Sequence, residues 1–297
     1  ENNGWKGCRV LVTGGAGFLG SHLVDRLVTC GAEVTVVDQH CGFGNGNLTS
    51  LTNDITRLEA DINSLAWTEL LRVRSFDYIY HLAGSASVPR SVQDPQTDYQ
   101  LNLWSTFRLL EALRKLSWRG RLIYASSAAV YGDPVRMPIT EGDPTIPISP
   151  YGVSRLSAER YLSVFSALYG LHAAALRFFS VYGPRQSKQV VFEFTDRLMR
   201  DPSELSIYGD GSQTRDFLYV QDAVHAAMLV AERGPLQGEV YNAATGRSYA
   251  IRDLVVILCQ ILGVNPRLNY SGSVRQGEPQ KWSVDIGRLE RLGFRAS

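Results

Sequence analysis

Residues 8–20 read CRVLVTGGAGFLG, and this stretch decides the fold of the chain. A short apolar run from Cys8 to Thr13 has the composition of a buried β-strand. It ends in a group of glycines, and residues 21–28 then follow the spacing of an amphipathic helix. The stretch therefore predicts a strand, a tight glycine turn and a helix in direct succession.

The glycines at positions 14, 17 and 20 have the spacing of a dinucleotide-binding turn. Gly14 allows the tight turn, Gly17 lets the backbone approach a pyrophosphate, and Gly20 lets the helix pack closely on the strand. The pyrophosphate would lie at the helix N-terminus, where free N–H groups and the helix dipole favour negative charge. Phe18 and Leu19 lie in the same turn and are candidate cofactor contacts.

The next strand-like run, residues 33–38, ends in Asp38, close to the offset expected for a ribose-binding acid. A carboxylate there accepts hydrogen bonds from both adenosine ribose hydroxyls and repels a 2′-phosphate. Asp38 therefore predicts NAD rather than NADP as the cofactor. Asp61 and Ile62 follow a third short strand and are candidates for contact with adenine, although a loop-capping role explains Asp61 equally well.

Strand-like and helix-like segments alternate through the first 179 residues. Further strands are predicted at 76–82, 121–126 and 173–178, and helices at 98–116 and 149–169. This alternation predicts an α/β fold with a doubly wound parallel sheet, the Rossmann architecture. After Phe179 glycines and prolines divide the chain, and only two helix-like stretches remain, 221–232 and 251–262. We therefore expect an NAD-binding domain over 1–179 and a smaller α/β substrate lobe over 180–297, with some chain crossing between the two.

Composition excludes several classes of protein. Hydrophobic residues make up 44% of the 297 residues and the net charge is +1, so neither a disordered chain nor a basic nucleic-acid-binding surface is expected. No apolar run reaches the roughly 18 residues of a membrane span, and no signal peptide is recognisable. The four cysteines, Cys8, Cys30, Cys41 and Cys259, match no zinc pattern. We therefore expect no metal site. We expect the four thiols to be reduced, as in the cytoplasm.

Tyr151 and Arg155 are candidates for acid–base chemistry. They stand four residues apart at the start of a predicted helix and so share one of its faces. A cation beside a phenol favours the phenolate, which makes a base that is usable near neutral pH. Ser126 and Ser127 leave the carboxyl end of a predicted strand, where their hydroxyls could bind a reacting sugar hydroxyl.

At this point the chain resembles the extended short-chain dehydrogenase/reductase family, in its NAD-dependent nucleotide-sugar epimerase/dehydratase branch, and is most similar to UDP-glucose 4-epimerases. The resemblance covers nearly the whole chain. Besides the glycine turn and the Tyr151 helix it rests on motifs at positions 81–84, 87–92, 126–132, 177–184, 209–217 and 275–279.

The resemblance implies roles for matching positions. Tyr151 resembles the general base, and Ser127 the hydroxyl that shares the proton of the sugar O4. Arg215 and Arg275 resemble the guanidinium groups that hold the nucleotide diphosphate, and Tyr208 and Ser180 face the substrate. Further cofactor contacts are implied at Leu82, Ala83, Asn102, Ser126 and Phe178. A homodimer is also expected.

Three features depart from the family pattern. Arg155 replaces a lysine that bonds the nicotinamide ribose, Ser180 replaces an asparagine, and the chain stops before the usual terminal helix. Arg155 keeps the positive charge but is larger, forked and never neutral. Since 26 of the 30 basic residues are arginines, coding drift, adaptation and lost activity all remain open explanations.

The residues beside Ser127 distinguish the reactions of the family. A 4,6-dehydratase carries an acid and a base where this chain has Ala128 and Ala129, and a 3,5-epimerase carries a nearby cysteine that is absent here. A 4-epimerase needs neither, so 4-epimerisation of a UDP-hexose is the preferred function. The alternatives are another NAD-dependent nucleotide-sugar enzyme, such as a decarboxylase or 4-keto reductase, and an inactive binding homologue.

Trp282 is predicted to set the width of the sugar pocket. It stands three residues before Asp285, at a position that helps to set this width in related 4-epimerases. A large side chain there leaves little space for an N-acetyl group at C2 and favours UDP-glucose and UDP-galactose. The alternative is that Trp282 turns away into the core of the lobe.

Overall fold

The computed structural model describes residues 3–41, 46–48, 55–273 and 280–297. Its centre is a seven-stranded sheet with the order β11-β6-β5-β4-β1-β2-β3, in which all neighbouring strands are parallel. The strands are β1 (Arg9–Thr13), β2 (Glu33–Asp38), β3 (Ile55–Glu59), β4 (Tyr78–His81), β5 (Arg121–Ser127), β6 (His172–Phe178) and β11 (Gln237–Ala243). The predicted doubly wound sheet is confirmed.

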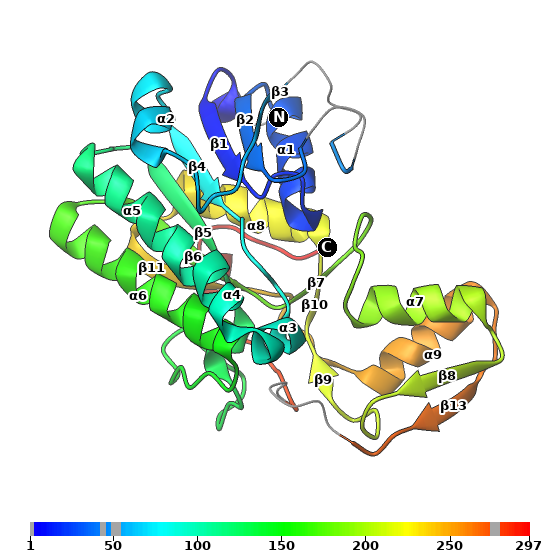
Figure 1. The fold of residues 1–297 in the computed structure, drawn as a ribbon. Coiled ribbons are helices and arrows are strands. Elements are labelled where there is room, and N and C mark those ends of the chain that lie inside the picture. Colours follow the sequence, from blue (N-terminus) through cyan, green and yellow to red (C-terminus); the bar gives the residue numbers. More distant parts are fainter. Residues whose placement is uncertain (1–2, 42–45, 49–54, 274–279) are drawn as a thin grey trace.

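Helices cover both faces of this sheet (Figure 1). One face packs on α1 (Phe18–Thr29) and α8 (Val220–Arg233), and the other on α2 (Trp67–Val73), α5 (Ser105–Lys115) and α6 (Pro150–Tyr169). Successive side chains of a strand point to opposite faces, so Val10 and Val12 of β1 join the first core and Leu11 joins the second. This two-sided burial explains why the strands read as continuous apolar runs.

The first strand of the chain lies in the middle of the sheet, and this strand order determines where a binding site can form. It runs from β1 outward to β2 and β3, and then returns to β4 on the other side of β1. The connections after β1 and β4 therefore leave the sheet in opposite directions, which opens a crevice at the carboxyl ends of these two strands.

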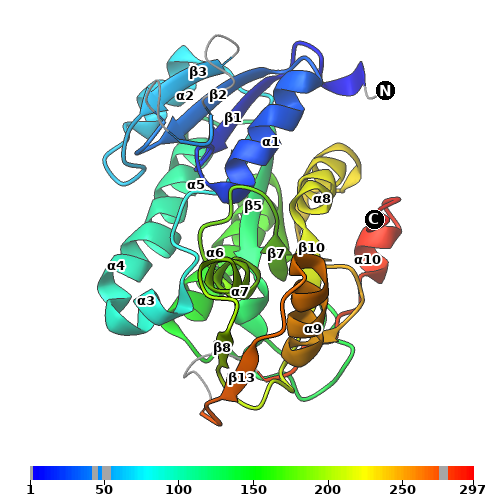
Figure 2. The same cartoon turned by 90° about the vertical axis from the view of Figure 1, so that its right-hand side faces the viewer.

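A smaller lobe lies beside that edge of the sheet (Figures 1 and 2). Its core packs α7 (Val190–Arg200) and α9 (Ile251–Leu262) against β8 (Glu204–Ile207), which pairs with β13 (Arg267–Tyr270). Short strand pairs link the lobe to the sheet domain: β7 (Ser180–Tyr182) with β10 (Phe217–Tyr219), and β9 (Thr214–Arg215) with β12 (Tyr249–Ala250).

The expectation of only two helices after residue 179 was wrong. Residues 190–200 form α7, because Val190, Val191, Phe194 and Leu198 recur at helical spacing on one face, and the nearby prolines at 184 and 202 stand outside the helix. The strand β11 was also not predicted, and it returns to the main sheet beside β6. The division into domains at residue 179 stays a prediction, since α8 and β11 follow it in sequence yet belong to the layers of the sheet.

The remaining elements are short. They are the 3₁₀ helices Asn3–Trp5 and Ala128–Tyr131, the helices α3 (Val88–Gln93), α4 (Pro95–Tyr99) and α10 (Gly287–Glu290), and a π-helical segment at Gln100–Trp104. Among the described residues, no helix combines the length and the apolar character that a membrane span requires.

Candidate active site

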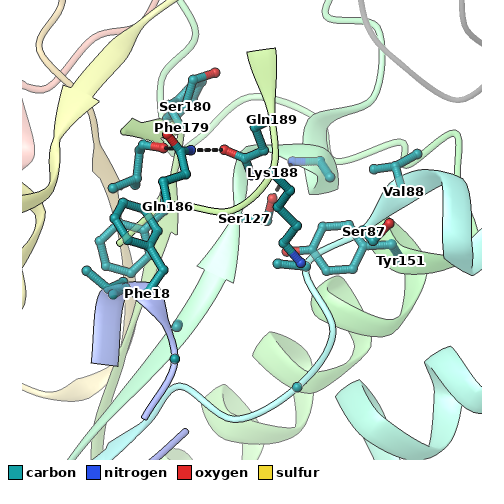
Figure 3. Close-up of a pocket in the computed structure, with 18 of the residues that line it drawn as sticks. Phe18, Ser87, Val88, Ser127, Tyr151, Phe179, Ser180, Gln186, Lys188 and Gln189 are labelled. Atoms are coloured by element: carbon teal, nitrogen blue, oxygen red, sulfur yellow. Dashed lines mark hydrogen bonds between the residues drawn. The ribbon is translucent and has the colours of Figure 1, made fainter. Parts of the chain in front are cut away.

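A cavity of about 700 Å³ occupies the crevice between the sheet and the lobe. Its walls come from the glycine turn after β1, from the ends of β2, β4, β5 and β6, from the N-terminal turn of α6, and from the lobe. Figure 3 shows Phe18, Ser127, Tyr151 and Ser180 around it, which come from α1, β5, α6 and β7. Residues far apart in sequence thus meet at the carboxyl edge of the sheet.

The glycine turn has the shape of a pyrophosphate cradle. Gly14 has φ +70°, and a Cβ there would lie 2.7 Å from the Ala83 nitrogen. A Cβ on Gly20 would collide with the Gly14 carbonyl, so the helix can pack this closely on the strand only because residue 20 has no side chain. Gly17 is the N-cap of α1, and a Cβ there would meet only the Gly14 carbonyl oxygen, at 3.2 Å. The space in front of the helix N-terminus therefore accepts a dinucleotide phosphate.

Asp38 lies beside this cradle at the end of β2. Its carboxylate accepts hydrogen bonds from the backbone N–H groups of Ala16 and His40, each at 3.1 Å, and the residue lines the cavity. These bonds fix the carboxylate and leave other lone pairs for ribose hydroxyls. The cradle and the placed acid together fit NAD, which is the cofactor predicted from the sequence.

The other predicted cofactor contacts fall into two groups. Most of them line the cavity: Phe18, Leu19, Ile62, Leu82, Ala83, Ser126, Arg155 and Phe178. Asp61 and Asn102 are not among its lining residues. The Asp61 carboxylate accepts a hydrogen bond from the Asn63 N–H at 2.8 Å, which is the loop-capping geometry.

Asn102 lies fully buried behind the cavity wall in the π-helical segment. Its side-chain oxygen accepts a hydrogen bond from the Ser85 N–H at 3.0 Å, and its amide donates to Asp98 at 2.7 Å. Asp98 in turn accepts from the Ser154 hydroxyl of α6 at 2.8 Å. The three side chains connect the loop after β4 to α6, so Asn102 holds the wall in place from behind.

Tyr151 and Ser127 enter the cavity from neighbouring elements. Ser127 ends β5, and its hydroxyl accepts the Ala129 N–H at 3.2 Å. Tyr151 lies in the first turn of α6, which Ser149 caps by accepting the Gly152 N–H at 3.2 Å. Both side chains line the same cavity, as their predicted roles require (Figure 3).

Arg155 is 3% exposed, and its guanidinium carbon lies 5.3 Å from the centre of the Tyr151 ring. The guanidinium donates to the Ala125 carbonyl at 2.7 Å, the Ser85 carbonyl at 3.2 Å and the Tyr124 hydroxyl at 3.3 Å. Burial works against its charge, yet the phenols of Tyr124 and Tyr151 hold the pKa of Arg155 above its usual value. The arginine is therefore a permanent cation that ties the end of β5 to the loop after β4.

A second buried cation lies behind Ser126 and was not assigned from the sequence. Arg177 forms a bidentate ion pair with Glu159, with contacts of 2.7–3.2 Å, and donates to the Tyr131 hydroxyl at 2.8 Å. The Ser126 hydroxyl donates to the same Glu159 carboxylate. The ion pair thereby positions β5 just before Ser127. The motif at 177–184 contains Arg177, but nothing in the sequence identified its partner.

On the substrate side, Ser180, Tyr208, Arg215 and Trp282 line the cavity. Trp282 is 8% exposed and packs edge-on against Phe179, with ring centres 5.3 Å apart. The Arg215 guanidinium lies 5.1 Å from the centre of the Trp282 ring. Trp282 thus lies at the cavity wall and packs in a hydrophobic cluster with Tyr131, Phe179 and Val284 that is separate from the core of the lobe, and its role in setting the pocket width stays a prediction. Arg275 lies outside the described residues.

Two wall segments were not assigned from the sequence. Ser87 and Val88 at the start of α3, and residues 186–191 before and in α7, also line the cavity. No group of three or more His, Cys, Asp and Glu side chains suited to a metal ion occurs in the described part of the chain.

Comparison with known proteins agrees with this geometry. Residues 10–244 match the model of the NAD dependent epimerase/dehydratase family. A UDP-glucose 4-epimerase of Mycolicibacterium smegmatis is 37% identical over 262 residues, which cover 86% of this chain and 83% of that protein.

Two solved structures are similar in fold and sequence. The UDP-glucose 4-epimerase of Thermotoga maritima, solved with UDP-glucose, has a TM-score of 0.89 and 36% identity, covering 97% of this chain and 94% of that one. The UDP-glucuronic acid 4-epimerase of Bacillus cereus, solved with UDP-glucuronic acid and NAD, has a TM-score of 0.88 and 32% identity, with the same coverage. The predicted family and its NAD dependence are confirmed: the chain belongs to the NAD dependent epimerase/dehydratase family.

Proposed function

We propose that the protein inverts the configuration at C4 of a UDP-hexose through a 4-keto sugar. The proposal rests on the residues that surround Tyr151 and Ser127. Both line the cavity beside the dinucleotide cradle, while Ala128 and Ala129 occupy the positions where a dehydratase carries its acid and base. Without those groups the keto sugar cannot undergo elimination. Rotation of the keto sugar within the cavity exposes the other face of C4, and reduction there gives the C4 epimer.

The residues of the chain divide the proton chemistry between them. Tyr151, as phenolate, takes the O4 proton, and Ser127 stabilises that oxygen by a hydrogen bond and relays the proton. NAD held by the glycine turn and Asp38 would supply the redox chemistry at C4, as hydride acceptor in the first half of the reaction and donor in the second. Tyr151 then gives its proton back to O4 of the epimer, so no acid, base or hydride is consumed.

Arg155 holds a positive charge under the Tyr151 ring in this scheme. Its two terminal nitrogens donate to the Ala125 and Ser85 carbonyls, while its Nε is buried without a partner among the described residues. We assign Arg155 to positioning and to the local field rather than to a ribose contact. A guanidinium suits this bridge because its planar fork reaches two acceptors at once.

Product analysis tests the function directly. The NAD-loaded protein is incubated with UDP-glucose, UDP-galactose, UDP-glucuronate and the N-acetylated UDP-sugars, and the products are identified by NMR. Formation of C4 epimers supports the proposal. Net formation of a keto sugar or pentose indicates one of the alternative enzymes, and tight binding of NAD and UDP-sugar without any product indicates an inactive homologue.

Asp38→Ser is expected to shift cofactor preference. The parent binds NAD more tightly than NADP, because a 2′-phosphate would meet the Asp38 carboxylate. Charged hydrogen bonds contribute about 1.5–3 kcal/mol, so the substitution should change the NADP-to-NAD affinity ratio by roughly tenfold or more, measured by calorimetry. A parent that binds NADP as tightly as NAD would contradict the assignment.

Trp282→Ser is expected to raise the ratio of kcat/KM for UDP-N-acetylgalactosamine to that for UDP-galactose. Trp282 fills the wall beside Phe179, and a serine opens space there. Partial loss of folding lowers both values together, so the ratio isolates the effect on the pocket. Adding a substituent of this size to a filled site costs about 1–3 kcal/mol, which corresponds to a tenfold or larger change. An unchanged ratio would remove Trp282 from the set of gating residues.

The assembly we propose is a homodimer formed through α6 and the helices before it. Exposed aromatic and aliphatic side chains gather on these helices: Tyr99, Trp104, Val153, Tyr161, Val164, Leu168 and Tyr169. Phe107 links them, with ring centres 5.8 Å from Trp104 and 5.2 Å from Tyr161. An apolar face of this kind favours binding of a second copy of the chain, and sedimentation equilibrium tests this assembly.

All four cysteines are free thiols, which supports a reducing compartment such as the cytoplasm.

A further inference from the structure

Contacts on two sides hold the loop from Gly183 to Gln189 over the cavity. Its Pro184 carbonyl contacts the His22 ring at 2.9 Å, and Arg185 pairs with Asp25 at 2.7 Å, so α1 anchors one side. Arg185 and Gln189 have φ values of +67° and +76°, which non-glycine residues adopt only where surrounding contacts impose them.

Gln186 fixes the other side of the same loop. This side chain is 9% exposed and donates to the Val181 carbonyl at 3.0 Å and to the Gln189 side chain at 3.1 Å (Figure 3). Because both sides of the loop are held, the backbone between Gln186 and Gln189 orients the side chain that extends from it into the cavity.

That residue is Lys188, one of only four lysines in the chain. Its side chain lines the cavity and extends into it in Figure 3, in the same cavity as Ser87, Ser127 and Tyr151. Among the described residues the Lys188 ammonium has no hydrogen-bond or ion-pair partner. The loop therefore presents to the cavity an ammonium that forms no ion pair with the described residues.

Ser87 adds a hydrogen-bond donor to the same wall. Its oxygen accepts the Arg90 N–H at 3.3 Å, so its own hydrogen is free for a ligand. The Arg90 guanidinium adds positive charge nearby, although Asp94, one turn later, offsets part of it. Lys188 is exposed in the free protein, yet desolvation and then the charge of Arg90 lower its pKa, and a bound anion would oppose this shift.

The geometry of a hexose indicates which anion this is. Tyr151 and Ser127 act on C4, and the C6 group is attached to C5, the neighbour of C4. The diphosphate is attached to C1, across the ring from C4. Since Lys188 shares the cavity wall with this pair, whereas Arg215 of the lobe is the candidate for the diphosphate, we expect the Lys188 ammonium to lie on the C6 side of the sugar.

We propose that Lys188, with the Ser87 hydroxyl, forms a carboxylate subsite, so that the substrate is a UDP-hexuronate rather than a neutral UDP-hexose. This inference rests on the proposed 4-epimerase function and specifies its substrate class. An ammonium paired with a carboxylate gives a charge-assisted hydrogen bond, and these are the stronger ones in proteins.

The test compares UDP-glucuronate with UDP-glucose in the parent, Lys188→Met, Lys188→Arg and Lys6→Met. Lys6 is an exposed lysine that does not line the cavity, so its variant controls for loss of one positive charge. Dissociation constants of both nucleotide sugars from the NAD-loaded protein are measured by calorimetry, and kcat/KM is measured for both.

The parent is expected to bind UDP-glucuronate at least about tenfold more tightly than UDP-glucose. Lys188→Met should abolish this preference with little effect on UDP-glucose, Lys188→Arg should restore part of it, and Lys6→Met should keep it. A parent without the preference, or an equal loss for both sugars in Lys188→Met, would overturn the subsite. If the binding preference is present but no sugar is epimerised, the proposed function fails and the subsite stands.

Discussion

Tyr151→Phe is expected to lower kcat by about 10²-fold or more while leaving the affinity for NAD unchanged. The substitution removes only the hydroxyl, and loss of a positioned acid–base group typically costs 10²- to 10⁴-fold. The ring that packs over the Arg155 guanidinium remains, so the wall of the cavity keeps its shape. Initial rates with the preferred UDP-sugar and calorimetric titration with NAD measure the two quantities.

Tyr80→Phe provides the matched control. Tyr80 is a fully buried phenol on β4 that does not line the cavity, and its hydroxyl has no hydrogen-bond partner among the described residues. Its removal should leave kcat near the parental value. If Tyr151→Phe also turned over at the parental rate, the base would have to be another group.

Glu159→Gln is expected to lower the free energy of unfolding by about 3–5 kcal/mol, the usual cost of breaking a buried ion pair. Glu159 and Arg177 are 3% and 2% exposed, so loss of the carboxylate charge leaves a guanidinium buried without a counter-ion. Glutamine has nearly the same shape, which separates the effect of charge from that of packing. Denaturant unfolding of the cofactor-free protein measures the change.

The same substitution at Glu111 is the control. Glu111 pairs with Arg114 at 2.7 Å on the partly exposed surface of α5, where water screens the charges. Surface pairs of this kind contribute about 0–1 kcal/mol. Equal losses at positions 159 and 111 would mean that Glu159 does not balance the buried charge of Arg177.

Local patterns in the sequence predicted the sheet domain well. Strands buried on both faces read as apolar runs, and the glycine turn marks the junction of β1 and α1, so these elements needed no tertiary information. The missed elements depend on long-range packing. β11 has few purely apolar residues and becomes a strand by pairing with β6, while α7 lies in a part of the chain where prolines and glycines dominate the local signal.

The site shows the same division between local and long-range information. Gly14, Asp38 and Tyr151 stand in motifs whose spacing has a chemical reason, and they were predicted. Lys188 has no such spacing. Its place in the cavity depends on the loop that His22, Asp25 and Gln186 hold, and these contacts form only in the folded chain.

The position of β11 has a consequence for synthesis on the ribosome. β6 ends at Phe178, but its outer edge stays uncovered until the chain has been extended through the entire lobe core around α7 and β8 to Ala243. During that interval the nascent chain exposes a β6 edge whose side chains are nearly all buried in the finished protein. Unprotected edges of this kind pair with other chains. Truncated chains that end between residues 180 and 236, released from the ribosome, should therefore recruit chaperones or aggregate more than the full chain does.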